Sequence, residues 1–253
     1  MRNRVLHALI LVIAFATASC RDATPKKSSL RILCGSSMAQ PIQEIGDQFA
    51  KSQGVEVIYD LGGSETLLPR VLADAPGDVF VCHDPFEEKV KAAGKLAGTA
   101  TVACLRPVLL VRPGNPQAIQ SIADLARPGL KIGIGDPRYS TCGEMFVQYL
   151  DQRGLREKVM ANVALQARAH TEIANGMIAG PLDAIVVWNF VAELYKGKVQ
   201  LIADDATYPP IRITILGLKQ SPNPQLRDAF LQMCRQPAAH EVFIRHGYSP
   251  LPK

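Results

Sequence analysis

Short apolar runs alternate along the chain with longer segments in which apolar residues recur at helical spacing. The first pair consists of the apolar run at residues 30–34 and a segment in which Ile42 and Phe49 share one helical face. Gly54 follows as a helix-stop signal. The pattern predicts a strand, a small turn at Gly35-Ser36-Ser37 and a helix. Such a turn directs backbone N–H groups and hydroxyls toward one point at the positive end of the helix dipole, which suits an anion.

The same arrangement recurs downstream. A β-branched run at 55–61 leads through Gly62-Gly63-Ser64 into a predicted helix over 67–72, and the strand at 131–136 leads through residues 140–143 into a helix that continues to about Arg153. The alternation of strands and helices favours an α/β fold with a mainly parallel sheet. Ligands of such folds bind outside the carboxyl ends of the strands, where these turns fall.

The remaining pattern completes this order. The apolar run at 102–111 is long enough to predict one long strand, although Arg106-Pro107 lies inside it. Because of its length and its internal proline, we expect this strand to pass from one domain to another. Further strands are predicted at 78–82, 183–188, 199–202 and 211–218, and further helices at 86–93, 119–125, 171–178, 224–234 and 238–246.

The N-terminus has the pattern of an export signal. Arg2 and Arg4 precede an apolar run at 5–18, and small residues then lead to Cys20. The pattern resembles a bacterial lipoprotein signal peptide over residues 1–20, with Cys20 as the lipidated residue and 21–29 as a polar tether. The alternative is a soluble exported protein in which Cys20 is an ordinary thiol. Either way the protein is expected outside the cytoplasm, in the periplasm or on the outer face of a bacterial membrane.

The charge and cysteine content argue against a nucleic-acid partner and for a free thiol. The formal net charge of +5 is partly carried by the signal and tether, and no basic run is interleaved with aromatic residues, so we expect no nucleic-acid partner. Beyond Cys20 the chain has Cys34, Cys82, Cys104, Cys142 and Cys234, an odd number without CxxC spacing. At least one thiol is therefore expected to be free.

Several segments together carry a family resemblance. They are Gly35-Ser36-Ser37-Met38, 61–67 (LGGSETL), 78–81 (DVFV), 133–137 (GIGDP), 183–188 (DAIVVW) and 242–248 (VFIRHGY). In order and spacing, the chain resembles the extracytoplasmic molybdate-binding proteins that serve ABC transporters, within the type II periplasmic binding-protein superfamily. The resemblance implies two α/β lobes around a ligand cleft, with 30–105 plus 206–253 as the first lobe and 106–205 as the second.

The resemblance also implies a ligand and the residues that hold it. The ligand would be a tetrahedral oxyanion, molybdate or tungstate, captured without a cofactor by a monomer and passed to an ABC transporter permease. Ser37 and Ser64 would donate from the first lobe. Three residues depart from the family pattern: Cys142 replaces an alanine, His170 an apolar residue and Trp188 a tyrosine. These departures leave the fold untouched and put the ligand in question.

Two alternatives remain open. Cys34, Cys82, His83, Cys142 and His170 all fall in or near the expected cleft turns, and sulfur with imidazole suits copper(I) or zinc. An enzyme with Cys34 or Cys142 as nucleophile and His83 or His170 as base is the less favoured reading, because no third member of such a site is identifiable. With an ordinary pKa of about 6.5, His170 would strengthen anion capture at lower pH, whereas in a metal site the same protonation would weaken capture.

Overall fold

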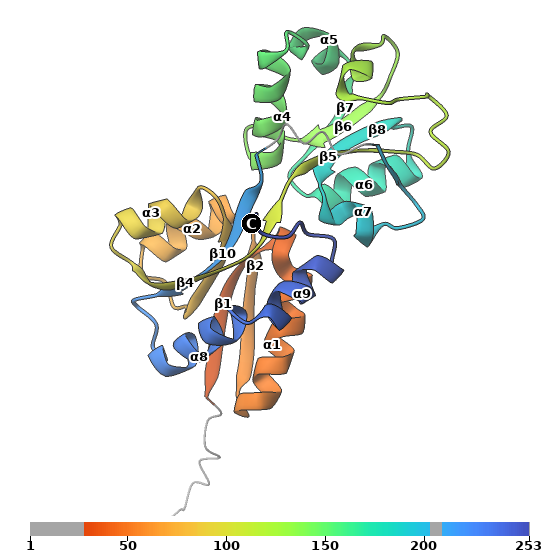
Figure 1. Cartoon of the computed structure of the whole chain (residues 1–253). Helices are drawn as coiled ribbons and strands as arrows, with labels where there is room; N and C mark the ends of the chain where they lie inside the picture. Colours follow the sequence, from red (N-terminus) through yellow and green to blue (C-terminus); the bar gives the residue numbers. More distant parts are fainter. Residues whose placement is uncertain (1–27, 203–208, 253) are drawn as a thin grey trace, which may run out of the picture.

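The computed structural model describes residues 28–202 and 209–252. It has two lobes, each with one five-stranded sheet and helices packed against it (Figure 1). The predicted α/β fold with two lobes is confirmed. The expected signal peptide at 1–20, with Cys20, lies outside the described residues, as does the tether up to residue 27. The first strand begins at Ser29, one residue earlier than expected.

The sheet of the first lobe has the strand order β2-β1-β3-β10-β4. Strand β1 is parallel to β2 and β3, while β10 is antiparallel to β3 and β4. The strands are β1 (Ser29–Gly35), β2 (Glu56–Gly62), β3 (Val79–His83), β4 (Leu96–Leu105) and β10 (Ile211–Leu218). The expectation of a mainly parallel sheet is wrong, because two of the strand pairs in this sheet are parallel and two are antiparallel.

The helices of the first lobe bury the apolar stripes seen in the sequence. Helix α1 (Ala39–Gln53) buries Ile42 and Phe49, and Phe49 meets Phe230 of α8 edge-on at 5.2 Å between ring centroids. It ends at Gly54, whose φ of 67° gives the left-handed stop that glycine adopts without strain. The other helical segments are η1 (Ser36–Met38), α2 (Ser64–Leu72), α3 (Phe86–Ala92), α8 (Pro224–Cys234) and α9 (Pro237–Arg245).

The sheet of the second lobe has the order β7-β6-β8-β5-β9 and is also mixed. Its strands are β5 (Pro107–Val111), β6 (Ile132–Gly135), β7 (Val163–Ala167), β8 (Ala184–Trp188) and β9 (Gln200–Leu201). Its helical segments are η2 (Ile122–Ala126), α4 (Thr141–Gln152), α5 (Arg156–Ala161), α6 (His170–Ala179) and α7 (Phe190–Leu194). Three of these, α5, β7 and α7, were not predicted from the sequence.

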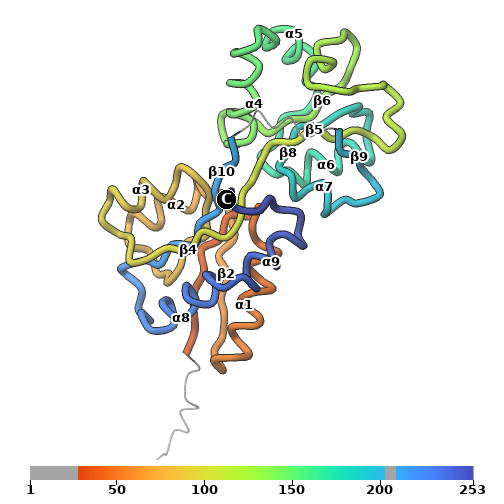
Figure 2. Tube along the Cα trace, viewed as in Figure 1, coloured from red at the N-terminus to blue at the C-terminus, as the bar shows by residue number. Residues whose placement is uncertain are grey.

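The chain passes between the lobes where the sequence predicted a crossing strand. Strand β4 lies in the first sheet and β5 in the second, with only Arg106 between them (Figure 2). Asn189 holds the backbone of Arg106 through two hydrogen bonds. The Asn189 side-chain Oδ1 accepts from the Arg106 backbone N–H at 3.1 Å, and the Asn189 backbone N–H donates to the Arg106 carbonyl at 2.9 Å. The exact division of the chain at 105/106 and 205/206 stays a prediction.

The C-terminal segment returns to this junction between the lobes. Ser249 pairs with Cys104 of β4, and the Asn189 side chain donates to the Gly247 carbonyl at 3.0 Å and to Ser249 Oγ at 3.2 Å.

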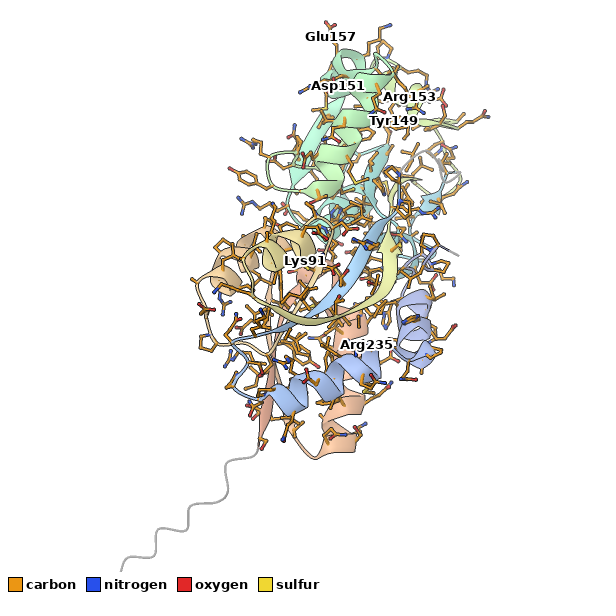
Figure 3. The ribbon with its side chains drawn as sticks, turned by 60° about the vertical axis from the view of Figure 1, so that its left-hand side comes forward. Lys91, Tyr149, Asp151, Arg153, Glu157 and Arg235 are labelled. Atoms are coloured by element: carbon orange, nitrogen blue, oxygen red, sulfur yellow. The ribbon has the colours of Figure 1, made fainter. Side chains whose placement is uncertain are left out.

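The far end of the second lobe lies away from this junction. There the Arg153 guanidinium packs 3.8 Å from the centre of the Tyr149 ring (Figure 3). Within the described part of the chain, no helix is both long and apolar enough to cross a membrane.

Candidate functional site

A cavity of about 400 Å³ lies between the two lobes. The turns that line it follow the carboxyl ends of β1, β2, β3, β6, β7 and β8 and precede helix starts, where open α/β sheets bind ligands. The first lobe contributes Gly35–Met38, Gln40, Gly63–Thr66, His83, His246 and Tyr248, and the second contributes Tyr139–Thr141, Arg168–Thr171, Trp188, Phe190 and Leu194. Four of the five predicted ligand-binding residues, Ser37, Ser64, His170 and Trp188, line this cavity together.

Two turns of the first lobe are brought together because β1 and β2 pair in register, with Gly35 opposite Gly62. A Cβ added at Gly35 would lie against the end of the Met38 side chain and 2.8 Å from Ser64 Oγ, so the absence of a side chain at Gly35 lets the two turns approach closely. Ser64 is the first residue of α2 and is only 3% exposed, yet its Oγ has no hydrogen-bond partner. A buried hydroxyl without a partner is costly, and a ligand in the cavity would satisfy it.

The start of α4 forms the matching turn in the second lobe. Ser140 caps the helix by accepting from the Gly143 N–H at 3.4 Å, and a side chain at Gly143 would collide with the Gly135 carbonyl. The Cys142 side chain is fully buried and does not line the cavity. Its backbone N–H lies in the first turn, where helical N–H groups have no carbonyl in a preceding turn. The contribution expected of Cys142 is therefore limited to its backbone.

His170 and His83 both pack against Trp188, with ring centroids 5.8 Å and 6.0 Å from the indole. His170 is the first residue of α6, 6% exposed, and its Nδ1 is buried without a partner. Burial, with a smaller contribution from His83, lowers the pKa of His170 to about 3. The expectation that His170 titrates near 6.5 is therefore wrong for the ligand-free protein, in which the ring is neutral at physiological pH.

Arg168 lines the cavity next to Tyr139. Arg168 stacks over the ring of Tyr139 at 3.8 Å, while Arg138, also next to Tyr139, is held by Asp136 through a 2.7 Å contact between Nη2 and Oδ2. Tyr139 and Arg168 lie two residues or fewer from predicted turns, and that proximity was the available signal in the sequence.

The residues of the metal alternative are not brought together. Of Cys34, Cys82, His83, Cys142 and His170, only the two histidines line the cavity. Burial raises the pKa of the three thiols above its usual range, which disfavours the thiolate that a soft metal requires. Across residues 28–202 and 209–252, no cluster of three or more His, Cys, Asp or Glu side chains is arranged to hold a metal ion. The structure therefore does not favour the alternative metal site, and the same burial makes Cys34 and Cys142 poor nucleophiles.

Comparison with known proteins agrees with this geometry. The family model for bacterial extracellular solute-binding proteins matches residues 30–249. The molybdate-binding protein ModA of Mycobacterium tuberculosis is 28% identical over 225 residues, covering 87% of this chain and 84% of that protein. A putative binding protein of Haemophilus influenzae is 23% identical over 224 residues, covering 88% of this chain and 91% of that protein.

Solved structures share the fold at lower identity. The periplasmic molybdate-binding protein of Azotobacter vinelandii has a TM-score of 0.75 at 22% identity, covering 88% of this chain and 100% of that chain. The sulfate-binding protein SubI of Mycobacterium tuberculosis also has a TM-score of 0.75, at 18% identity, covering 88% of this chain and 87% of that chain. Since the family model spans almost the whole described chain, the protein belongs to the family of bacterial extracellular solute-binding proteins.

Proposed function

We propose that this protein captures a tetrahedral oxyanion, molybdate or tungstate, in the cleft between its lobes and delivers it to an ABC transporter permease. The observation that carries the proposal is the pair of buried, unpartnered polar atoms at the cavity, Ser64 Oγ and His170 Nδ1, each on the first residue of a helix. The resemblance to molybdate-binding proteins selects the ligand among the oxyanions.

The proposed site consists of Ser37, Ser64, the backbone N–H of Cys142, His170 and Trp188. Neutral donors and helix starts favour a dianion, and we propose that no cofactor is needed to hold it. Hydrogen bonds to a charged group contribute about 1.5–3 kcal/mol each, so five to seven would supply roughly 10–20 kcal/mol before the costs of desolvation and closure. Sub-micromolar affinity needs about 8 kcal/mol net, which this set can provide.

Capture would draw the lobes together. We propose that 30–105 plus 206–253 and 106–205 move as two rigid bodies about the β4–β5 connection, in a protein that acts as a monomer. Small-angle scattering of the ligand-free and molybdate-saturated protein tests this. A smaller radius of gyration with molybdate at unchanged mass is expected, and an unchanged radius at saturation would contradict closure.

The ligand is tested by thermal unfolding and calorimetry with molybdate, tungstate, sulfate, phosphate and zinc. A ligand present at 100 times its dissociation constant stabilises the native state by about 2.7 kcal/mol, which a thermal shift detects readily. Molybdate and tungstate are expected to give the largest shifts. If neither changes the midpoint at millimolar concentration while another ion does, the proposed ligand is wrong.

Membrane attachment through Cys20 is proposed separately, because it rests on the sequence alone. The apolar run at 5–18 and its terminal cysteine motivate it. Replacing Cys20→Ala should abolish labelling with a lipid precursor and release the exported protein from the membrane fraction, while Cys34→Ala serves as the control. Retained lipid labelling in Cys20→Ala would reject the anchor.

A further inference from the structure

His83 lies in the cavity with only one of its ring nitrogens engaged. The ring is 7% exposed, and Nδ1 lies 2.7 Å from the Asp84 carbonyl oxygen. A carbonyl only accepts, so Nδ1 carries the hydrogen and donates it. In the neutral ring Nε2 is then a bare acceptor, which fixes the tautomer of His83. What this side chain has left to offer a ligand is a lone pair.

A lone pair is the wrong partner for an oxyanion without a proton. The groups proposed to hold the ligand are donors, namely the Ser64 hydroxyl and the N–H groups at the helix starts. Placed next to a molybdate oxygen, bare Nε2 would repel it. A proton on Nε2 turns this repulsion into a charge-assisted hydrogen bond, which is about twice as strong as a neutral one.

The surroundings of the two imidazoles decide which of them takes the proton. His170 opens α6, where the positive end of the helix dipole opposes a cation. His83 ends β3, and the carboxylates of Glu65 on α2 and Asp84 on its own turn favour its charged form. Arg212 of β10 partly offsets Asp84 through a 2.9 Å ion pair. A positive charge on either His83 or His170 disfavours a positive charge on the other, so we expect only one of the two imidazoles to be protonated at a time.

We propose that His83 is a further ligand-binding residue of the cleft, and that capture of a doubly charged oxyanion takes up one proton from solvent onto its Nε2. The only bond formed is this N–H bond, and nothing is oxidised or reduced. The inference rests on the proposed oxyanion function. Before binding, desolvation keeps the pKa of His83 below its usual value, so the ring is neutral. The charge of the bound anion then favours the imidazolium.

Calorimetry in buffers of different ionisation enthalpy counts the protons. Titration of the full protein with molybdate at pH 7.5 in HEPES and in Tris should show an uptake of about one proton per anion. Affinity should then rise roughly tenfold for each unit of pH decrease between 8.5 and 6.5, the slope for one proton. His83→Asn keeps an N–H in the place of Nδ1 and removes Nε2. It should bind more weakly, with no uptake and a flat pH profile.

His240→Asn is the matched control, because His240 lies on α9 and does not line the cavity. It should keep the parental proton count. Imidazole NMR signals of the unmutated protein give a measurement that does not depend on the folding of a variant: one histidine should change from neutral to charged on addition of molybdate at pH 7.5. Binding with equal heats in both buffers and no such change would overturn the proton uptake while leaving the proposed function intact. No binding of molybdate or tungstate would instead overturn the proposed function, and this inference with it.

Discussion

The phenolic O–H of Tyr248 donates a hydrogen bond to the backbone carbonyl of Ser37. The two residues come from opposite ends of the described chain, and Ser37 belongs to the turn after β1 that lines the cavity. The Tyr248 ring stacks on Phe190 of the second lobe, with centroids 5.4 Å apart and ring planes at 10°. Tyr248 therefore contacts a cavity-lining turn of one lobe and a helix of the other at the same time.

Replacing Tyr248→Phe should loosen the Ser37 turn while keeping the ring stack. The lost hydrogen bond should cost about 0.5–1.5 kcal/mol of unfolding free energy, and oxyanion affinity should fall several-fold because the turn is less well placed. Urea unfolding and calorimetry measure the two effects. Tyr59→Phe removes a similar hydrogen bond to the Gln43 carbonyl, away from the cavity, and should leave affinity unchanged. Equal affinity losses in both variants would contradict a specific role for Tyr248.

Replacing Ser64→Ala should separate binding from stability. The Ser64 hydroxyl has no partner in the ligand-free protein, so its removal should leave the unfolding free energy unchanged or slightly higher. Loss of a donor to a charged ligand should weaken oxyanion binding by about 1–3 kcal/mol. The fluorescence of Trp188, the single tryptophan of the chain and part of the cavity wall, provides the binding signal.

The control for this experiment is Ser52→Ala. Ser52 Oγ donates to the Phe49 carbonyl at 3.0 Å near the end of α1, so this variant removes a serine hydroxyl outside the cavity. It should bind like the parent. If Ser64→Ala also binds molybdate like the parent, Ser64 is not a ligand-binding residue.

The buried histidine at the start of α6 should make the ligand-free protein sensitive to mild acid. The pKa of His170 is lowered to about 3, whereas the unfolded chain binds the proton near 6.5, so the unfolded state holds more protons between these values. Stability should fall as pH decreases below about 6.5, by up to about 1.4 kcal/mol per pH unit from this residue. Urea unfolding from pH 7.5 to 4.5 should show a shallower decline for His170→Asn. A decline as steep as that of the parent would be evidence against this origin, and His240→Asn controls for loss of a histidine elsewhere.

The thiols should be inert in the native protein. All five described cysteines are buried, and burial raises the pKa of Cys142 well above its usual range. Iodoacetamide should label none of these five under native conditions and all of them after unfolding, as mass spectrometry can count. Cys142→Ala keeps the backbone N–H and should bind oxyanion within twofold of the parent. A large loss of affinity would show that the Cys142 side chain contributes to oxyanion binding, against this prediction.

The sequence predicts the elements whose signal is local. The strand at 30–34, the helix that ends at Gly54 and the capped start of α4 follow from apolar spacing, turn residues and a serine cap. Strand direction has no such signal, which explains why antiparallel β10 was not recognised within a sheet expected to be mainly parallel. Segments of five or six residues, such as α5 and β7, contain too few periods to stand out.

The site was predictable to the level of its turns. Ser37, Ser64, His170 and Trp188 were placed by motif position, and all four line one cavity. What could not be read from sequence is which atom of a residue reaches that cavity. Cys142 directs its side chain into the core, and the neutral state of His170 depends on burial by residues distant in the chain. Tyr248 lies in a recognised motif, but its partner Ser37 is known only from the fold.

Strand β10 lies between β3 and β4, and in sequence the whole second lobe separates it from both. A chain emerging from its N-terminus cannot complete the first sheet until residues 211–218 are available, because β3 and β4 do not pair with each other. The sheet of the second lobe draws all its strands from residues 107–201 and faces no such delay. Strand pairs this distant in sequence form slowly, because the entropy cost of closing the long loop comes before the contacts that offset it. The first lobe is therefore expected to form last, because its sheet stays incomplete until β10 has been synthesised.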